Sequence, residues 1–198
     1  YLIGKKGFWK NSFIVTPDVL VPRPETETLV DAILNENLQG KTLLELGTGS
    51  GAIPISIAQE NKDCFIFATD ISIKSILVAK QNAAKFCCEN IIFLNHDWNN
   101  EWLFPQVDYL ISNPPYVDKE ATTGREEGIW YEPEKALFSK DKGLSDLKLI
   151  LSKGKNFLNE NGKVYLEHAP DQYEELNKFA MENGYLNFSN LNDLNGDK

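Results

Sequence analysis

The sequence predicts an α/β fold, in which a doubly wound, mostly parallel sheet carries helices on both faces and is preceded by a short β-hairpin. Segments with helical periodicity alternate with short apolar segments, which is the order expected of parallel strands joined by helices. Turn residues follow several of the apolar segments. A chain of 198 residues is ordinarily one domain and buries about 70% of its unfolded surface.

The expected helices have apolar residues three and four positions apart, and the expected strands are short apolar runs. The helix at 72–86, for example, has Ile73, Ile76, Leu77 and Ala84 on its apolar stripe. The predicted helices cover residues 26–36, 72–86, 144–158 and 171–183, and one more follows the glycine loop at 47–51. The predicted strands cover residues 43–46, 65–70, 91–95, 107–112 and 163–167, the last after an Asn161-Gly162 turn.

The expected hairpin covers residues 8–15 and is interrupted by Asn11 and Ser12. We expect two parts: residues 1–24 hold a short N-terminal stub, the hairpin and a leading segment, and residues 25–198 form the α/β domain. The longest irregular stretch, residues 117–135, contains Gly124 and Gly128. Loops of this length are usually functional or mobile, so it is either a lid or a solvated insertion.

Composition excludes several classes of protein. The net charge of −9 opposes nonspecific nucleic-acid binding, which needs a basic surface. Cys64, Cys87 and Cys88 have no C-x-x-C spacing, so neither a disulfide framework nor a metal site is expected, and a reducing cytoplasm is. No stretch approaches the ~18 consecutive apolar residues of a membrane helix.

The sequence Asn113-Pro114-Pro115-Tyr116 directly follows the predicted strand at 107–112. The Asn113 side chain and the proline backbone offer carbonyl oxygens, and Tyr116 offers a flat ring. A Pro-Pro turn has few conformations, so these acceptors are fixed in advance. Together they suit a planar, uncharged NH2 group, such as an amide or an aromatic amine. The alternative is a stiff turn that only ends a strand.

A glycine loop follows the first strand of the predicted sheet. Gly47, Gly49 and Gly51 alternate with Thr48 and Ser50, which lets the backbone pass close to a ligand and direct N–H groups at it. The spacing is G-x-G-x-G, whereas dinucleotide-binding loops have G-x-G-x-x-G. A tight strand-to-helix turn without a ligand is the other reading.

Acidic residues follow the next two strands. Asp70 ends the strand at 65–70, where a carboxylate accepts hydrogen bonds from ribose hydroxyls in doubly wound sheets, although it could instead cap the helix that starts near Ser72. Asp97 and Trp98 follow the strand at 91–95 and could bond the amino group and cover the ring of adenine. Trp98 could equally be part of the core.

Four motifs therefore follow four successive strands. The loops after parallel strands share one edge of the sheet, so these motifs converge on one crevice. This convergence predicts a nucleoside-bearing cofactor beside a pocket that holds an amine.

Residues 15–27, which contain Pro-Arg-Pro-Glu-Thr-Glu, resemble the leading segment of the HemK/PrmC-like release-factor glutamine methyltransferases, a family of class I S-adenosylmethionine-dependent methyltransferases. The four motifs above occur in that family in the same order, as do Glu132-Pro133, Ala136-Leu137 and Leu166-Glu167-His168, so the resemblance covers residues 8–197. Two departures are visible. The family carries a small helical domain before this part and a final strand after it, so we expect the last strand to be truncated.

The resemblance implies a Rossmann-like methyltransferase that moves a methyl group from S-adenosylmethionine to the amide nitrogen of the Gly-Gly-Gln glutamine in peptide-chain release factors. It implies that Asn113, Pro114, Pro115 and Tyr116 hold the acceptor. The cofactor residues it implies are Gly47, Thr48, Gly49, Ser50, Gly51, Asp70, Asp97, Trp98 and Asn113, with Glu45 beside the methionine portion. We expect a monomeric cytoplasmic enzyme without direct nucleic-acid or membrane contact.

Three alternatives belong to other classes. An enzyme that methylates the exocyclic amine of adenine in DNA or RNA would share Asn-Pro-Pro-Tyr, but it needs a flipped or single-stranded base and a basic channel. A noncatalytic cofactor-binding scaffold would have no need of the acceptor motif. A nicotinamide dehydrogenase is disfavoured by the glycine spacing.

Overall fold

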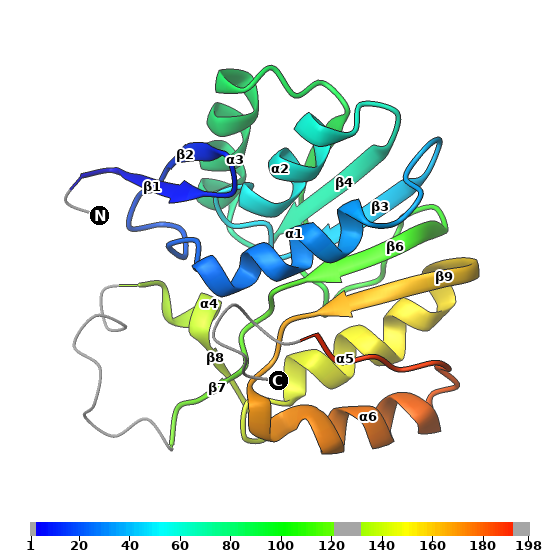
Figure 1. Ribbon diagram of the computed structural model, residues 1–198. Helices are drawn as coiled ribbons and strands as arrows, with labels where there is room; N and C mark the ends of the chain where they lie inside the picture. The colour runs from blue at the N-terminus through cyan, green and yellow to red at the C-terminus, as the bar shows by residue number, and fades with distance from the viewer. Residues whose placement is uncertain (1–2, 121–131, 192–198) are drawn as a thin grey trace.

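The computed structural model describes residues 3–120 and 132–191, and within them a five-stranded parallel sheet forms the centre of the molecule (Figure 1). The strand order is β5-β4-β3-β6-β9, so the order reverses between β3 and β6. The strands are β3 (Thr42–Leu46), β4 (Phe65–Asp70), β5 (Ile91–Asn95), β6 (Val107–Ser112) and β9 (Leu158–Leu166).

Helices cover both faces of this sheet, as the sequence predicts. Those on one face are α1 (Glu27–Leu34), α2 (Ala52–Glu60) and α3 (Ile73–Lys85), while α5 (Ser145–Gly154) and α6 (Tyr173–Glu182) lie on the other (Figure 1). Short 3-10 turns precede α1 (Pro24–Thr26) and α6 (Pro170–Gln172) and follow α5 (Lys155–Phe157). The doubly wound fold is thereby confirmed, and similar solved methyltransferase structures are described below.

Strand β3 is buried on both faces. Leu43 contacts the core beneath α1 and α2, whereas Leu44 and Leu46 contact the core beneath α5. All three leucine side chains are fully buried, and each such burial stabilises the fold by about 1.5–3 kcal/mol. A strand covered on both sides in this way is typical of the centre of a parallel sheet. It holds the glycine loop, which follows Leu46, at a rigid position.

The N-terminal hairpin is present, but its turn differs from the predicted one. Strands β1 (Lys5–Phe8) and β2 (Asn11–Ile14) pair antiparallel, and Phe8 pairs with Asn11. The turn therefore consists of Trp9 and Lys10, and Trp9 adopts a φ of +50°. Asn11 and Ser12, predicted to interrupt the hairpin, lie within β2 because a two-residue turn is enough to reverse the chain.

The hairpin is fixed to α3 and shares the main core. Asn82 of α3 accepts from the Ile14 N–H at 2.8 Å and donates to the Ile14 carbonyl at 3.0 Å. Phe8 and Phe13 are fully buried in the same cluster as residues of α1 and α2. A division of the chain at residue 24 stays a prediction, and it does not coincide with a break in this core.

The apolar stripe predicted for α3 is partly wrong. Ile76 is buried, but Ile73 and Leu77 are 55% and 54% exposed, and Ala84 is exposed too. The buried face instead carries small and polar side chains, namely Ser75, Val78, Ala79, Asn82 and Ala83. Asn82 explains the difference, since its side chain must point inward to bond the hairpin.

Strand β9 also differs from its prediction, because it begins before the expected Asn161-Gly162 turn. Val107 of β6 pairs with Leu158, and Tyr109 pairs with Lys163, so residues 159–162 form a bulge within the pairing. A Cβ on Gly162 would lie 3.1 Å from the Asp108 carbonyl oxygen, which is why the bulge needs a glycine. The predicted helix at 144–158 ends at Gly154 for α5.

The predicted loop at 117–135 lies only partly within the described residues. Strand β7 (Val117–Asp118) pairs with β8 (Phe138–Ser139), and α4 (Glu134–Leu137) directly precedes β8. Residues 121–131, with Gly124 and Gly128, lie outside the described part, so the lid hypothesis stays a prediction. Of the helices in residues 3–120 and 132–191, none is both long and apolar enough to cross a membrane.

Candidate active site at the carboxyl edge of the sheet

The glycine loop brings two of the predicted motifs into contact. Gly47 has a φ of +77°, a conformation that favours glycine. A Cβ at Gly47 would lie 3.3 Å from the Trp98 ring and 4.0 Å from the Asn113 backbone oxygen. The Asp97-Trp98 motif and the Asn113-Pro114-Pro115-Tyr116 motif therefore meet at one residue of the loop. This is the convergence that the order of motifs predicts.

Several backbone amides of the glycine loop are already hydrogen-bonded within the protein. The N–H groups of Gly47 and Thr48 both donate to the Thr69 carbonyl, at 2.9 and 2.8 Å. The Gly51 N–H donates to the Thr48 carbonyl at 2.8 Å. Buried amides rarely remain unpaired, and here the neighbouring strand β4 supplies their acceptor. Close approach of a ligand to the loop, and any bond from its remaining N–H groups, stay predictions.

Asp70 ties the glycine loop to the start of α3. One carboxylate oxygen, Oδ2, accepts from the Gly49 N–H at 2.9 Å, and Oδ1 accepts from the Ser72 N–H at 2.8 Å. Ser72 itself caps α3, because its hydroxyl accepts from the Ser75 N–H. Burial raises the pKa of the Asp70 carboxyl, while the two N–H bonds act in the opposite direction. Each oxygen still has a lone pair with which to accept from a hydroxyl.

Helix α5 holds the Trp98 loop with two charged side chains. Asp146 accepts from the Trp98 indole N–H at 3.0 Å. The Lys153 ammonium donates to the carbonyls of Trp98 and Asn99 at 2.8 Å and of Asn100 at 2.9 Å. Asp146 and Lys153 are seven residues apart, which places them two turns apart on one helix face. The Trp98 ring is thereby fixed beside Gly47.

Asp97 is bonded locally. Its Oδ1 accepts from both the backbone N–H and the side-chain amide of Asn99, at 2.9 and 2.8 Å. The Asn99 bonds contribute to lowering the pKa of Asp97, so this side chain is a carboxylate at neutral pH. One oxygen is thus occupied by the turn, and the adenine role of Asp97 stays a prediction.

Glu45, at the end of β3, is a buried carboxyl without a partner among the described residues. The residue is 1% exposed, and neither carboxylate oxygen has a hydrogen-bond partner in residues 3–120 or 132–191. Burial raises the pKa of Glu45 to about 8; the nearby Thr48 hydroxyl opposes this shift, and the Asp70 carboxylate adds to it. At this pKa the carboxyl is mostly protonated at neutral pH, and a cationic ligand placed beside it would favour its charged form.

We predict that Glu45→Gln removes a pH-dependent loss of stability. The carboxyl titrates near its ordinary pKa of 4.5 in the unfolded chain but near 8 in the fold. The folded state therefore binds more protons over that range, so the free energy of unfolding falls as pH rises from about 4.5 to 8. Thermal melts of both proteins from pH 5 to 9 should diverge progressively, with the variant the more stable above pH 7. Parallel melting profiles would contradict the assignment.

The acceptor turn follows β6, and side chains from two other segments hold it. The Asn113 side-chain N–H donates to the Thr26 hydroxyl at 3.0 Å, so the amide oxygen faces away from Thr26. Pro114 and Pro115 are buried, and the Tyr116 hydroxyl donates to Glu167 Oε1 at 2.8 Å. The turn is thus held at both ends. The roles of the Asn113 side-chain oxygen and the Pro114 backbone oxygen as acceptors for a bound amine stay predictions.

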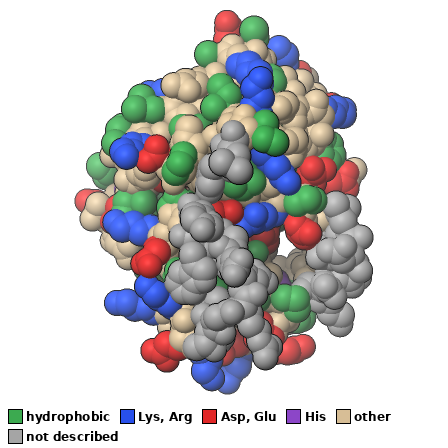
Figure 2. Space-filling view, turned by 90° about the vertical axis from the view of Figure 1, so that its left-hand side faces the viewer, with side chains coloured by type: hydrophobic (Ala, Val, Ile, Leu, Met, Phe, Trp, Pro, Cys, Tyr) green, Lys and Arg blue, Asp and Glu red, His purple; other side chains and the backbone are tan. Residues whose placement is uncertain are grey.

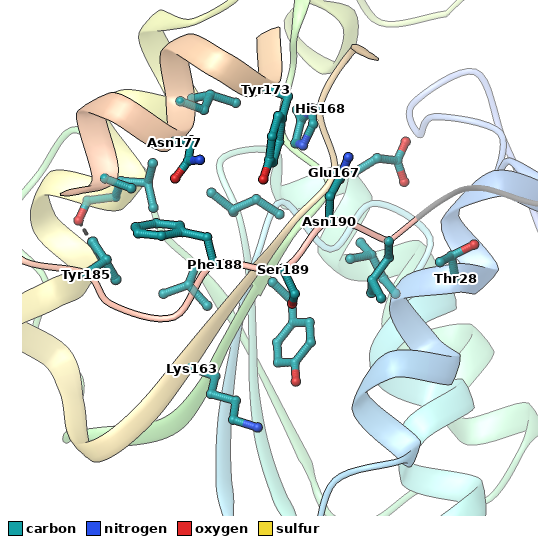
Figure 3. Close-up of a pocket in the computed structure, with 18 of the residues that line it drawn as sticks. Thr28, Lys163, Glu167, His168, Tyr173, Asn177, Tyr185, Phe188, Ser189 and Asn190 are labelled. Atoms are coloured by element: carbon teal, nitrogen blue, oxygen red, sulfur yellow. Dashed lines mark hydrogen bonds between the residues drawn. The ribbon is translucent and has the colours of Figure 1, made fainter. Parts of the chain in front are cut away.

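A cavity of about 760 Å³ lies beside the acceptor turn, between β9, α1 and α6 (Figure 3). Tyr116, Glu167 and His168 line it near the turn, and residues 185–191 line it farther away. No residue of the glycine loop lines this cavity. The glycine loop, where Trp98 and the Asn113 backbone meet, therefore lies outside this cavity.

The face of the molecule at the carboxyl ends of the strands carries charges of both signs. Figure 2 shows this face, where Lys and Arg side chains are interspersed with Asp and Glu and a hollow opens in the lower half.

Comparison with known proteins identifies the family. Residues 24–130 match the family model described as methyltransferase small domain. The release factor glutamine methyltransferase of Francisella tularensis subsp. tularensis is 36% identical over 199 residues, which cover 98% of this chain and 70% of that protein. The chain belongs to the release factor glutamine methyltransferase family. The family member from Coxiella burnetii is 37% identical and covers 99% of this chain and 71% of its own length.

Solved structures of more distant methyltransferases share the family's fold. A methyltransferase from Pyrococcus furiosus aligns with a TM-score of 0.64 at 20% identity, over 88% of this chain and 78% of that one. A ribosomal protein L11 methylase from Lactobacillus delbrueckii subsp. bulgaricus gives a TM-score of 0.63 at 18% identity, over 88% and 77%. These similarities confirm the predicted Rossmann-like methyltransferase sheet.

Proposed function

We propose that this protein transfers a methyl group from S-adenosylmethionine to the side-chain amide nitrogen of a glutamine, the one in the Gly-Gly-Gln motif of peptide-chain release factors. Membership of the release factor glutamine methyltransferase family supports the reaction and its cofactor. The structural observation that carries the proposal is the meeting of Trp98, Gly47 and the Asn113 turn at one edge of the sheet.

The residues around the glycine loop fit a cofactor of this kind. The partnerless, buried carboxyl of Glu45 suits the positively charged methionine portion. The remaining lone pairs of Asp70 suit the ribose hydroxyls, and the Trp98 ring, fixed beside Gly47, suits the face of adenine. When bound, S-adenosylmethionine supplies a methyl group on a cationic sulfur, which is a strong electrophile without further activation.

The acceptor residues have to orient a weak nucleophile, because an amide nitrogen shares its lone pair with its carbonyl. The Asn113 side-chain oxygen and the Pro114 backbone oxygen would accept the two N–H bonds of the glutamine amide. Pro115 and Tyr116 would pack against its plane. These bonds strengthen as positive charge grows on nitrogen, so they stabilise the transition state more than the bound substrate. Orientation of this kind contributes up to about 7–11 kcal/mol in favourable cases.

The substrate for which the relatives are named also bears on partners and location. A release factor is a protein partner, and the protein would act on it as a cytoplasmic monomer without direct nucleic-acid contact. Residues 25–198 would form the catalytic domain. The mixed charge of the face in Figure 2 and the net charge of −9 support a protein substrate over a DNA or RNA one.

The main expected effect of Asp70→Ala is weaker cofactor binding. The substitution removes the acceptors for the ribose and the bonds that hold Gly49 and Ser72 in place. Losing charge-assisted bonds of this kind raises the dissociation constant of S-adenosylhomocysteine by about 10- to 100-fold. Calorimetry measures the change, with Asp63→Ala as the control because Asp63 is exposed near the start of the same strand. An unchanged constant would rule out the ribose role.

The substrate is tested by labelling. The protein is incubated with radiolabelled S-adenosylmethionine and, in parallel, a bacterial release factor, the same factor with its Gly-Gly-Gln glutamine changed to alanine, and DNA or RNA. We expect label only in the unchanged release factor. Label in nucleic acid, or equal label in the alanine variant, would contradict the proposal.

A further inference from the structure

Glu167, directly after β9, is placed where it can organise the acceptor turn. Its Oε1 accepts from the Tyr116 hydroxyl at 2.8 Å. Its other oxygen, Oε2, is buried on the side of Thr26 and Asn113, both of which hydrogen-bond this carboxyl group. In Figure 3 the carboxylate points away from His168 and Tyr173, toward the side of the cavity formed by α1.

Thr26 connects Glu167 to Asn113. The Thr26 hydroxyl accepts from the Asn113 side-chain N–H at 3.0 Å, so its own proton remains to be donated. Glu167 is the carboxyl group beside it: burial raises the pKa of Glu167, and hydrogen bonds from Thr26, Tyr116 and Asn113 oppose that shift. Thr26 is only 5% exposed, so water does not compete freely for these bonds. Asn113, Thr26, Glu167 and Tyr116 therefore form one buried network.

The network determines which way the Asn113 amide faces. An asparagine amide can turn over, exchanging its oxygen and nitrogen, at little cost when no neighbour distinguishes them. Here a hydroxyl whose proton is directed to a carboxylate can only accept from Asn113. The amide nitrogen must then face Thr26, and the amide oxygen must face the acceptor.

We propose that Glu167 is a positioning residue of the acceptor site, which acts through Thr26 and Tyr116 to hold the Asn113 oxygen and the Tyr116 ring toward the incoming amide nitrogen. The inference rests on the proposed function, because it assigns the residue that orients that function's acceptor turn. A carboxylate suits this task, because it can only accept hydrogen bonds. The hydroxyls of Thr26 and Tyr116 must therefore both direct their protons toward it.

The test compares Glu167→Gln with two substitutions at Thr26. Glutamine keeps the shape but replaces one acceptor by a donor, so kcat/KM for the release factor should fall by about 10- to 100-fold, the equivalent of one buried charge-assisted bond. Thr26→Val should lower kcat/KM by the same factor. Thr26→Ser keeps the hydroxyl, so its kcat/KM should stay within about threefold of the wild-type value. The double variant with Glu167→Gln and Thr26→Val should lose little more than either single variant, because both break one network.

Glu36→Gln is the matched control for folding. Glu36 accepts from the Tyr165 hydroxyl and from the Lys163 ammonium, both at 2.6 Å, and it lines the same cavity, so this substitution weakens a tyrosine–carboxylate bond and an ion pair outside the acceptor turn. It should lower the melting temperature about as much as Glu167→Gln while leaving kcat/KM unchanged. S-adenosylhomocysteine should bind all these variants with the wild-type dissociation constant.

A second readout is independent of the substrate. In NMR spectra of the protein, the side-chain amide protons of Asn113 should exchange slowly with solvent in the wild type and in Thr26→Ser. They should exchange faster in Glu167→Gln and Thr26→Val. Full activity in Glu167→Gln, or unchanged Asn113 exchange in both variants, would overturn the inference. If the wild type labels no release factor while the exchange pattern holds, the proposed function fails and the network stands.

Discussion

Asn113→Ala should lower kcat for methylation of the release factor by about 100- to 1,000-fold, the usual cost of removing one preorganised hydrogen-bonding group that acts in a transition state. The substitution deletes the side-chain oxygen and leaves the strand, the two buried prolines and the Tyr116–Glu167 bond in place. Binding of S-adenosylhomocysteine should change only a few-fold, because the backbone of residue 113 and not its side chain lies nearest to Gly47. Steady-state kinetics and calorimetry on the same preparation separate the two effects.

Asn177→Ala provides the control for this exchange. Asn177 lies on α6 and lines the cavity beside the acceptor turn, and its Oδ1 has no partner within the described residues. The same loss of an amide at this neighbouring site should leave kcat within about twofold, as for most substitutions away from special contacts. If Asn113→Ala retains full kcat, or if its whole effect is a weaker cofactor affinity, the amine-receptor role is wrong.

The strand ends could be predicted from sequence because each depends on a local pattern. Apolar runs that stop at Gly47, Asp70, Asp97 and Asn113 define where the carboxyl edge lies, and parallel topology brings those ends together. The contact of Gly47 with both Trp98 and Asn113 follows from that rule. The bonding of the loop amides does not, since it depends on whether the Thr69 carbonyl lies within reach.

The residues that hold the motifs in place could not be predicted, because they come from elements distant in sequence. Asp146 and Lys153 carry no motif, and they meet the Trp98 loop only because of the way α5 packs on the sheet. Thr26 and Glu167 do lie in segments that resemble the family. Their bonds to the acceptor turn nevertheless depend on side-chain directions that a linear pattern does not contain.

Gly143→Ala should be among the most damaging single-methyl changes in the protein, although Gly143 lies outside every motif. A Cβ there would lie 1.9 Å from the Tyr116 carbonyl oxygen and 2.5 Å from the Gln172 Nε2 atom that bonds this oxygen. The position also has a φ of +84°, which disfavours alanine. Strain, overpacking and a displaced hydrogen bond together should cost about 3–5 kcal/mol, or roughly 10–15 °C in melting temperature. Because the atom that must move belongs to Tyr116, kcat should fall as well.

Gly184→Ala separates the clash from the backbone strain. Gly184 has a similar φ of +79°, but the nearest atom to its added Cβ is Lys155 Cε at 4.0 Å. This control should therefore cost only the conformational penalty of about 1–2 kcal/mol, or roughly 3–6 °C, with kcat unchanged. Thermal melts and kinetics of the two variants test the comparison. Equal melting temperatures, or normal kcat in Gly143→Ala, would show that the acceptor turn tolerates displacement of Tyr116 and that its rigid placement is not what makes the site work.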